Sequence, residues 1–310
     1  ALSSAASDVY KRQIEIKAYE HSAATRLIED FMLLTNETIA EEYYWLELPF
    51  VYRIHETPDE EKLRTFATFL NNFGYSLHLT NHTIHPKELQ KLLSRIEGSE
   101  AEGLISRILL RSMKQAKYSP ENLGHFGLSA KYYCHFTSPI RRYPDLQIHR
   151  IIKEQLHGTL SKSRQEHYEH ILPSVCDSSS KLERRADEAE RETDKLKKAQ
   201  YMRRHIGDIY EGVISGVTAY GFYVELTNTV EGLVRAANLD DDYYIYDQEH
   251  YQLVGEMTGR TFSIGQSVSV VVVDADTLTK QIEFLLYYPE EDWSKGETRH
   301  GKRKSKTHRK

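Results

Sequence analysis

Over roughly the first 205 residues, apolar side chains recur at the three- and four-residue spacing of amphipathic helices. The stretch 24–42 shows the period most clearly, with Leu27, Ile28, Phe31, Leu34 and Ile39. The stretch 49–63 begins as a short strand, and a helix opens at 58–60, since proline followed by acidic residues favours a helix start. Further helices are predicted over 85–96, 101–118, 144–158 and 167–205.

At Ile206 the pattern changes to an alternation of apolar and polar residues that is broken by glycines. This period of two predicts short strands with tight bends, notably over 267–273 and 281–286. Five such strands in about eighty residues favour a small Greek-key barrel of the OB type. The fold class is therefore α+β, with a mostly helical domain over 14–205, a barrel over 206–288 and a tail over 289–310.

Charge is distributed unevenly along the chain. Residues 294–310 hold eight Lys or Arg and one Glu, which is a formal charge of +7. Because the whole chain has a net charge of −5, the remaining residues carry a charge of −12. Such a tail cannot bury a core, and we expect it to be disordered and to meet a polyanion. A solubility or sorting tail is the alternative. The strongest basic cluster within it is Lys302, Arg303 and Lys304.

Composition excludes several classes of protein. No run of eighteen apolar residues spans a membrane, and no signal peptide is visible. Cys134 and Cys176 form no CxxC and have no zinc spacing, which favours a reducing compartment. We therefore predict a soluble, cytoplasmic protein. Residues 1–13 show no clear apolar period, and we interpret them as a non-native leader at the edge of a truncated reading frame.

The run from His125 to Arg150 is the most informative motif. It interleaves histidines and arginines with aromatic residues, and Pro139 and Pro144 flank the pair Arg141–Arg142. Guanidinium groups beside aromatic rings suit the binding of phosphates and the stacking of bases, and the prolines restrict the backbone that carries them. The alternative is a polar loop between two helices with incidental arginines.

This run, the segment before it and ERRADEAER at 183–191 resemble the ribonuclease R branch of the ribonuclease II (RNB) family. The segments EGVISGVTAYGFYVEL and VEGLV resemble the S1-type RNA-binding barrel of that family, and the basic tail is similar as well. The resemblance implies a processive 3′-to-5′ exoribonuclease that hydrolyses single-stranded RNA to nucleoside 5′-monophosphates. It also implies two magnesium ions held by a cluster of aspartates in the first half of the catalytic domain.

No DxxxxxDxDD cluster occurs in this sequence. The nearest run, Asp240-Asp241-Asp242, lies within the predicted barrel, and we interpret it as a loop. We therefore expect no metal ligands here and consider the chain the C-terminal part of an RNB catalytic domain that is inactive alone.

By the motif match, Arg141 corresponds to the family's catalytic arginine, and Glu29 resembles its contact to the terminal ribose, with Asp30 as the alternative by one register. Further RNA-binding candidates from the resemblance and the composition of the runs are Arg142, Tyr143, His149, Arg150 and Glu190. For Arg142 a structural ion pair is equally open. Asp145 and His149 lie four residues apart on one helix face, and we favour a role in orienting the arginine loop.

On the barrel, Tyr220, Phe222 and Tyr223 fall where the second strand should face solvent, and they are predicted to stack on bases. Alternation turns at least one of them into the core, and either Phe222 or Tyr223 is the candidate.

Two classes of function remain open. One is a hydrolase fragment, and the other is a non-catalytic module that binds single-stranded RNA; an aspartate cluster upstream in the reading frame would separate them. A translation-factor-like OB adaptor leaves SPIRRYPD unexplained. The expected partner is single-stranded RNA, with the ribosome or the RNA-decay machinery as further candidates, no membrane, and a monomeric state.

Overall fold

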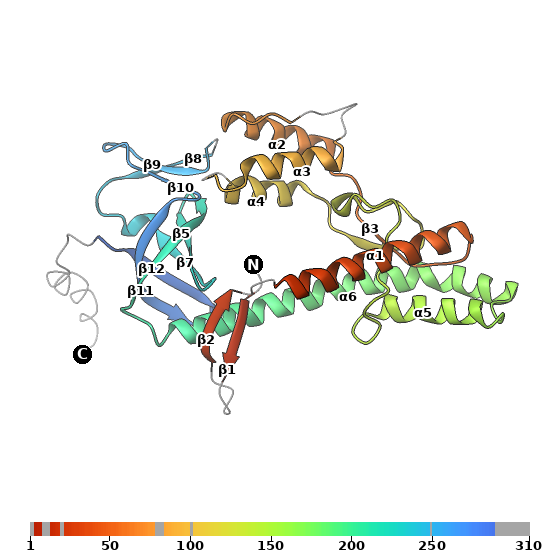
Figure 1. The fold of residues 1–310 in the computed structure, drawn as a ribbon. Coiled ribbons are helices and arrows are strands. Elements are labelled where there is room, and N and C mark those ends of the chain that lie inside the picture. The colour runs from red at the N-terminus through yellow and green to blue at the C-terminus, as the bar shows by residue number, and fades with distance from the viewer. Residues whose placement is uncertain are drawn as a thin grey trace, which may run out of the picture.

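The computed structural model describes residues 3–7, 13–18, 22–77, 84–99, 102–248 and 250–288. It shows a helical part and a barrel part that are joined by one long helix, α6 (Lys162–Met202). Figure 1 shows the barrel at one end of α6, the helices of residues 23–45 and 143–156 beside the rest of it, and the helices of residues 60–112 in a layer apart from α6. Within the described ranges, no helix combines the length and the apolar character needed to cross a membrane.

The helical part follows the predicted α+β order. Its helices besides α6 are α1 (Ala23–Trp45), α2 (Glu60–Asn72), α3 (Pro86–Ile96), α4 (Glu102–Ser112) and α5 (Tyr143–Leu156). Short elements between them are β3 (Tyr52–Ile54), β4 (Lys117–Ser119) and the 3-10 turn η1 (Phe126–Leu128). The side chains of Ser22 and Asp59 accept from the first free backbone N–H groups of α1 and α2, which fixes where these helices begin.

One helix was predicted too long. The expected helix over 101–118 ends at Ser112, whose hydroxyl donates to the carbonyl of Leu109, and residues 117–119 form β4 instead. Tyr118 is buried and pairs with Arg53 of β3, and its N–H donates to the Ser180 hydroxyl on α6 at 2.9 Å. Tertiary pairing therefore overrides the helical period of this short stretch.

Two apolar cores stabilise the helical part. The first joins the inner face of α1 to β3, β4, α5 and α6, and includes Phe50, Tyr52, Ile148 and Leu172. The second is built by α2, α3 and α4 and is closed by Phe126 of η1. The loop with the arginine pair leads into α5 and therefore sits on the first core.

The barrel is closed and five-stranded, in the order β11-β12-β7-β6-β5, which confirms the predicted OB-type architecture. Only the pairing of β12 with β7 is parallel. A Cβ at position 232 would overlap the Phe284 ring, so glycine lets that ring fill the interior. The strands are β5 (Ile209–Thr218), β6 (Gly221–Leu226), β7 (Glu231–Arg235), β11 (Ser267–Asp276) and β12 (Gln281–Leu286).

Between β7 and β11 the strands that the alternation predicts form a separate sheet, which the expected five-stranded barrel did not include. The 3-10 turn η2 (Ala236–Asn238) is followed by an antiparallel sheet of β8 (Tyr244–Asp247), β9 (Gln252–Gly255) and β10 (Thr261–Ser263). Tyr251, at the turn of this sheet, packs its ring edge against Phe69 of α2 at 5.5 Å between centroids. The insertion thus joins the barrel to the helical part.

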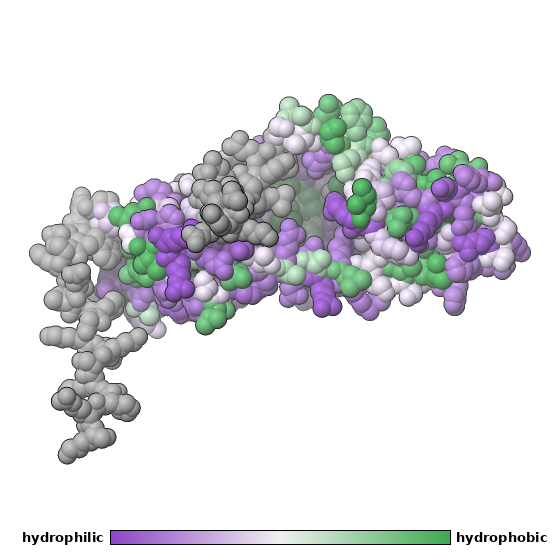
Figure 2. Space-filling model, turned by 90° about the horizontal axis from the view of Figure 1, so that it is seen from below, coloured by the Kyte–Doolittle hydropathy of each residue, from purple (hydrophilic) through white to green (hydrophobic). Residues whose placement is uncertain are grey.

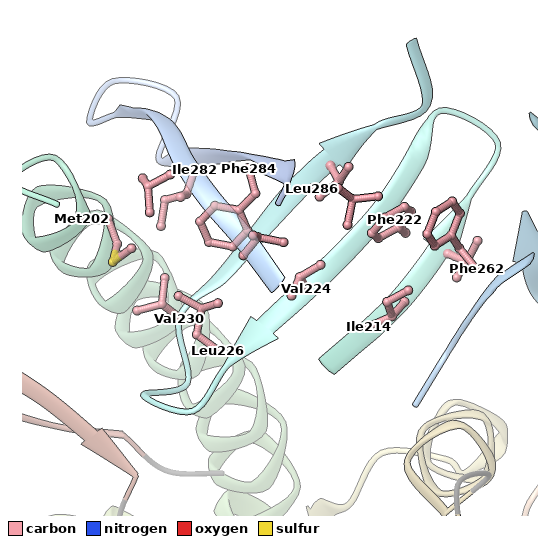
Figure 3. Close-up of a cluster of buried hydrophobic side chains, with 14 of the residues drawn as sticks. Met202, Ile214, Phe222, Val224, Leu226, Val230, Phe262, Ile282, Phe284 and Leu286 are labelled. Carbon is pink, nitrogen blue, oxygen red and sulfur yellow. The ribbon is translucent and has the colours of Figure 1, made fainter. Parts of the chain in front are cut away.

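The barrel core is filled from inside and capped by α6. Phe222, Phe262 and Phe284 are fully buried, and Figure 3 shows them with Met202 of α6 at the edge of the same cluster. Because the last turn of α6 contributes to this core, the long helix is fixed to the barrel by apolar packing.

The segment interpreted as a leader lies partly within the described residues. Strand β1 (Ser3–Ser7) pairs antiparallel with β2 (Gln13–Ala18), and Ile16 belongs to the barrel cluster. Its non-native origin stays a prediction.

Candidate functional site

The arginine loop is a tight turn immediately before α5. The backbone N–H groups of Arg141 and Arg142 both donate to the Ser138 carbonyl, at 3.3 and 3.1 Å. Asp145, in the first turn of α5 and fully buried, accepts from the Ser138 N–H at 2.8 Å and from Arg142 Nη2 at 2.9 Å through the same oxygen, Oδ2. One carboxylate therefore fixes both ends of the turn.

This anchoring leaves Arg141 free. Its side chain is exposed, and among the described residues its guanidinium has no hydrogen bond or ion pair. The neighbouring Ile140 is fully exposed at the tip of the turn. Arg141 also lies at the N-terminal end of α5, where the helix dipole favours an anion. A planar guanidinium held at such a position can bind two oxygens of a phosphate.

Arg142 differs from its neighbour. Only 17% of its side chain is exposed, and it forms the ion pair with Asp145, which is the structural alternative that the sequence left open. Three buried atoms of this turn have no hydrogen-bond partner in the described structure: Thr137 Oγ1, Arg142 Nε and Asp145 Oδ1.

A second set of contacts holds the strand-like segment that leads into the turn. The His149 ring stacks on Phe136 with centroids 4.1 Å apart, and its Nε2 is hydrogen-bonded to the Phe136 carbonyl at 2.9 Å. Asn36, buried in the middle of α1, accepts from the Phe136 N–H at 2.9 Å and donates to the Tyr133 hydroxyl. His149 therefore orients the loop rather than pairing with Asp145.

Two half-buried histidines lie behind the turn. His135 Nδ1 is hydrogen-bonded to the Tyr118 hydroxyl at 2.9 Å. Burial, followed by the positive charges of Arg142, Arg53 and their neighbours, lowers the pKa of His135 to about 2. Burial also lowers the pKa of His125 to about 4. Both rings are neutral near pH 7, so the positive charge of the site comes from arginines.

The remaining candidates of the helical part do not join this cluster through direct contacts. Glu29 is exposed on the first half of α1, and Glu190 is exposed on α6. Within the described ranges neither carboxylate has a hydrogen bond or ion pair with the arginine loop. Tyr143 and Arg150 lie together on α5, with the guanidinium 5.8 Å from the ring centroid.

On the barrel, one aromatic prediction is wrong. Phe222 is fully buried and stacks on Phe262, because β6 starts at Gly221 and its alternation turns 222, 224 and 226 inward. Tyr220 and Tyr223 remain outside, with hydroxyl oxygens 3.0 Å apart. That hydrogen bond, together with burial, raises the pKa of Tyr223 to about 12, so the Tyr223 hydroxyl is neutral near pH 7.

Arg235 belongs to the same face and was missed by sequence reasoning. It lies opposite Gly221 in the β6–β7 register and forms an ion pair with Glu283 of β12. The available signal was a basic residue at the end of a predicted strand, three residues after Gly232. Asn36 was missed too, although a polar residue on the inner stripe of an amphipathic helix indicates a buried hydrogen-bond partner. Lys302, Arg303 and Lys304 lie outside the described residues.

The residues present do not fit a catalytic metal centre. No group of three or more His, Cys, Asp or Glu side chains is placed to hold an ion anywhere in the described ranges. In the aspartate run, Asp241 accepts from Tyr244 and Arg260, while Asp242 accepts from Thr258 and the backbone of Met257. These carboxylates stabilise the β8–β9 insertion, as the loop interpretation expects.

Comparison with family models matches an RNB domain over residues 2–158 and an S1 RNA binding domain over residues 204–286. The chain is 46% identical to ribonuclease R 1 of Lactococcus lactis over 278 residues, which is 90% of this chain and 34% of the relative. It is 43% identical to ribonuclease R of Aquifex aeolicus over 283 residues, 90% of this chain and 39% of the relative. The chain thus spans between about a third and two fifths of the length of these relatives.

Solved structures give the same picture. The RNase R of Mycoplasma genitalium in complex with ribose methylated single-stranded RNA aligns with a TM-score of 0.83 at 25% identity, over 92% of this chain and 45% of that chain. Yeast Ssd1, described as a pseudonuclease, aligns with a TM-score of 0.59 at 25% identity, over 76% of this chain and 29% of that chain.

Proposed function

The chain belongs to the RNB domain family, and we propose from this premise that it is the part of a ribonuclease R-like 3′-to-5′ exoribonuclease that carries the catalytic arginine and the S1 barrel. The observation that carries the proposal is the Arg141 guanidinium, which is exposed and has no partner among the described residues, on a turn that Asp145 fixes. The similarity to ribonuclease R proteins over 90% of the chain supports it.

In the proposed reaction, Arg141 binds two non-bridging oxygens of the scissile phosphate and stabilises the charge that develops there. Water attack on the terminal linkage releases a nucleoside 5′-monophosphate. When bound, magnesium supplies the activation of water and the stabilisation of the leaving oxygen. The residues of this chain do not form that centre, so the proposal assigns it to other parts of an RNB domain and expects the chain alone to be inactive.

For the substrate we propose single-stranded RNA. The solved relative from Mycoplasma genitalium is a complex with such a strand, and the S1 match favours the same class of ligand. On the barrel, the exposed pair Tyr220 and Tyr223 offers rings for base stacking, with Arg235 beside them for phosphate. Tyr143, Arg150 and Glu190 remain RNA-binding predictions, as does the basic cluster Lys302–Lys304. Glu29 remains the prediction for the ribose contact that prefers RNA to DNA.

The alternative function is a non-catalytic module that binds single-stranded RNA. The missing metal ligands in the described ranges favour it, and so does the similarity to a pseudonuclease. Contacts with the ribosome or the RNA-decay machinery, a monomeric state and a cytoplasmic location stay predictions.

The test measures the binding of an oligoadenylate by gel shift and its degradation with and without magnesium. We expect binding and no degradation by the chain itself. Arg141→Ala should weaken binding about fivefold through the lost phosphate contact, since a charge-assisted hydrogen bond contributes about 1 kcal/mol or more. Arg95→Ala, which removes an exposed arginine on α3, is the control and should change binding less than twofold.

In a longer version that carries the rest of the RNB domain, Arg141→Lys should lower turnover far more than RNA affinity, because lysine keeps the charge but loses the fork. Equal losses in both would reduce Arg141 to a binding residue. Magnesium-dependent degradation by the chain alone would refute its assignment as an inactive part.

A further inference from the structure

The first half of α1 has an apolar surface that nothing in the described structure covers. Leu27, Ile28, Phe31 and Leu34 are between 56% and 62% exposed. The first buried residue of the helix is Asn36, followed by Ala40 and Tyr43. Two turns of helix therefore carry a stripe of large apolar side chains without packing.

The stripe lies opposite the face of α1 that packs on the core. At about 100° per residue, the four exposed side chains fall within an arc of roughly 120°, and the buried positions 36, 40 and 43 fall on the other side. A helix that is apolar on two opposite faces is characteristic of a helix buried on both. By contrast, the outer face of α3 carries Lys87, Gln90, Lys91 and Arg95, as expected for a helix that faces water.

From this geometry, and resting on the proposed function, we propose that the α1 stripe is the docking face for the rest of an RNB-type catalytic domain, on the same chain or supplied separately. The solved relative from Mycoplasma genitalium aligns with nearly all of this chain and has 55% of its own length outside the alignment. The Lactococcus lactis relative has 66% of its length outside. Chains of this type therefore hold enough additional polypeptide to cover the stripe.

The stripe is connected to the arginine turn through α1 itself. Leu34 is two residues before Asn36, which lies on the opposite face of the helix and holds the Phe136 backbone next to the arginine turn. A domain part that docks on the stripe would therefore fix the helix whose other face supports the loop of Arg141. In the view from below, the surface is hollowed near its middle, and hydrophobic residues line part of the hollow (Figure 2).

Charge disfavours two other occupants. Helix α1 carries five acidic residues and one arginine, which disfavours an RNA phosphate backbone lying along the stripe. A single ribose hydroxyl at Glu29, as proposed above, requires no such backbone contact. The same net charge disfavours two copies of α1 packed against each other. An apolar protein surface from the remainder of the domain has neither disadvantage.

The experiment compares this chain alone with a chimera in which it replaces the matched part of the Lactococcus lactis relative. Hydrogen exchange is followed at the backbone amides of residues 27–35. We expect these amides to exchange at least 100-fold more slowly in the chimera, because docking removes the fraying of an unpacked helix. Equal exchange rates in both proteins would overturn the proposal.

Paired variants keep the test independent of overall folding. Ile28→Gln with Phe31→Gln should lower the protection of these amides at least tenfold in the chimera and less than twofold in the chain alone. Leu156→Gln with Leu278→Gln, which alters two apolar residues elsewhere that are 77% and 90% exposed, should change neither. An equal effect of the two pairs in the chimera would contradict the inference.

Two more readouts separate the hypotheses. If the protection of residues 27–35 in the chain alone rises with protein concentration, a second copy covers the stripe and the proposal is wrong. Magnesium-dependent RNA degradation by the chimera is measured separately. A protected but inactive chimera would support docking and refute the exoribonuclease assignment, whereas an active chimera with unprotected α1 would refute docking alone.

Discussion

The barrel and the helical part differ in how completely they bury their apolar residues. In the barrel, strand closure pairs the backbone edges, and Phe222, Phe262 and Phe284 fill the interior completely. In the helical part, α1 packs with its second half and leaves the first half uncovered. The barrel core is therefore closed by its own residues, Ile16 of β2 and the end of α6, whereas the α1 stripe has no packing partner within the described residues.

The largest expected effect is a difference in stability between two phenylalanine variants, one in the barrel core and one on α1. Phe222→Ala removes a fully buried ring from the barrel core and should lower the free energy of unfolding by about 3–5 kcal/mol. Phe31→Ala removes a ring that is 58% exposed on α1 and should change it by less than about 0.5 kcal/mol in the chain alone. Urea denaturation followed by circular dichroism measures both.

Similar losses for the two variants would mean that the α1 stripe is already packed, and the contrast would fail. A large effect of Phe31→Ala only in the longer chimera would sharpen the contrast, because it would assign the missing packing to the rest of the domain.

The sequence predicted the parts of the fold that repeat a simple period. The amphipathic stretches gave α1, α2, α3 and α5 within a few residues, and the alternation after Ile206 gave the barrel. It did not predict β4, because three residues carry too short a period to compete with a neighbouring helix. Strands were expected in the β8–β10 segment, but their arrangement as a separate sheet was not, since tyrosines and acidic residues alternate there without a clear apolar face.

For the candidate site, the motif identified the arginine pair but not the difference between its members. Whether Arg141 or Arg142 is free depends on which guanidinium reaches Asp145, and this follows from the turn at Ser138 rather than from composition. Likewise, alternation left Phe222 and Tyr223 as equal candidates for the barrel core. The start of β6 at Gly221 decided between them.

The next effect tests how firmly the helical part holds its arginine turn. Asp145→Asn removes the charge that neutralises Arg142 in a buried pair and should lower the free energy of unfolding by about 3 kcal/mol. It should also speed the hydrogen exchange of the Ser138 backbone amide, because this N–H donates a hydrogen bond to the Asp145 carboxylate in the wild-type chain. Urea denaturation and exchange measurements check the two expectations.

Asp177→Asn is the matched control, because it breaks the exposed pair with Lys181 on α6 and should cost less than about 0.5 kcal/mol. If both variants behave alike, Asp145 does not anchor the turn, and the free state of Arg141 needs another explanation.

The smallest expected effect is a pH dependence of the free energy of unfolding that differs between the two regions. In the helical part, burial lowers the pKa of His125 to about 4 and that of His135 to about 2. Residues 206–288 contain one histidine, His250, and its side chain is exposed. As the pH falls below the ordinary histidine value of about 6.5, the unfolded chain takes up protons that the folded helical part does not. Stability should therefore fall with pH, by at most about 1.5 kcal/mol between pH 7.5 and 6.0 for the two histidines together.

Urea denaturation at the two pH values measures this loss. His135→Gln should remove about half of it, and His250→Gln should leave it unchanged. If His250→Gln reduces the pH dependence as much as His135→Gln does, protonation acts on the whole molecule, and the buried histidines do not set the acid sensitivity of the helical part. If the loss is confined to the helical part, acid would weaken the support of the arginine turn by His135 and Tyr118. The barrel face proposed to bind RNA would be unaffected.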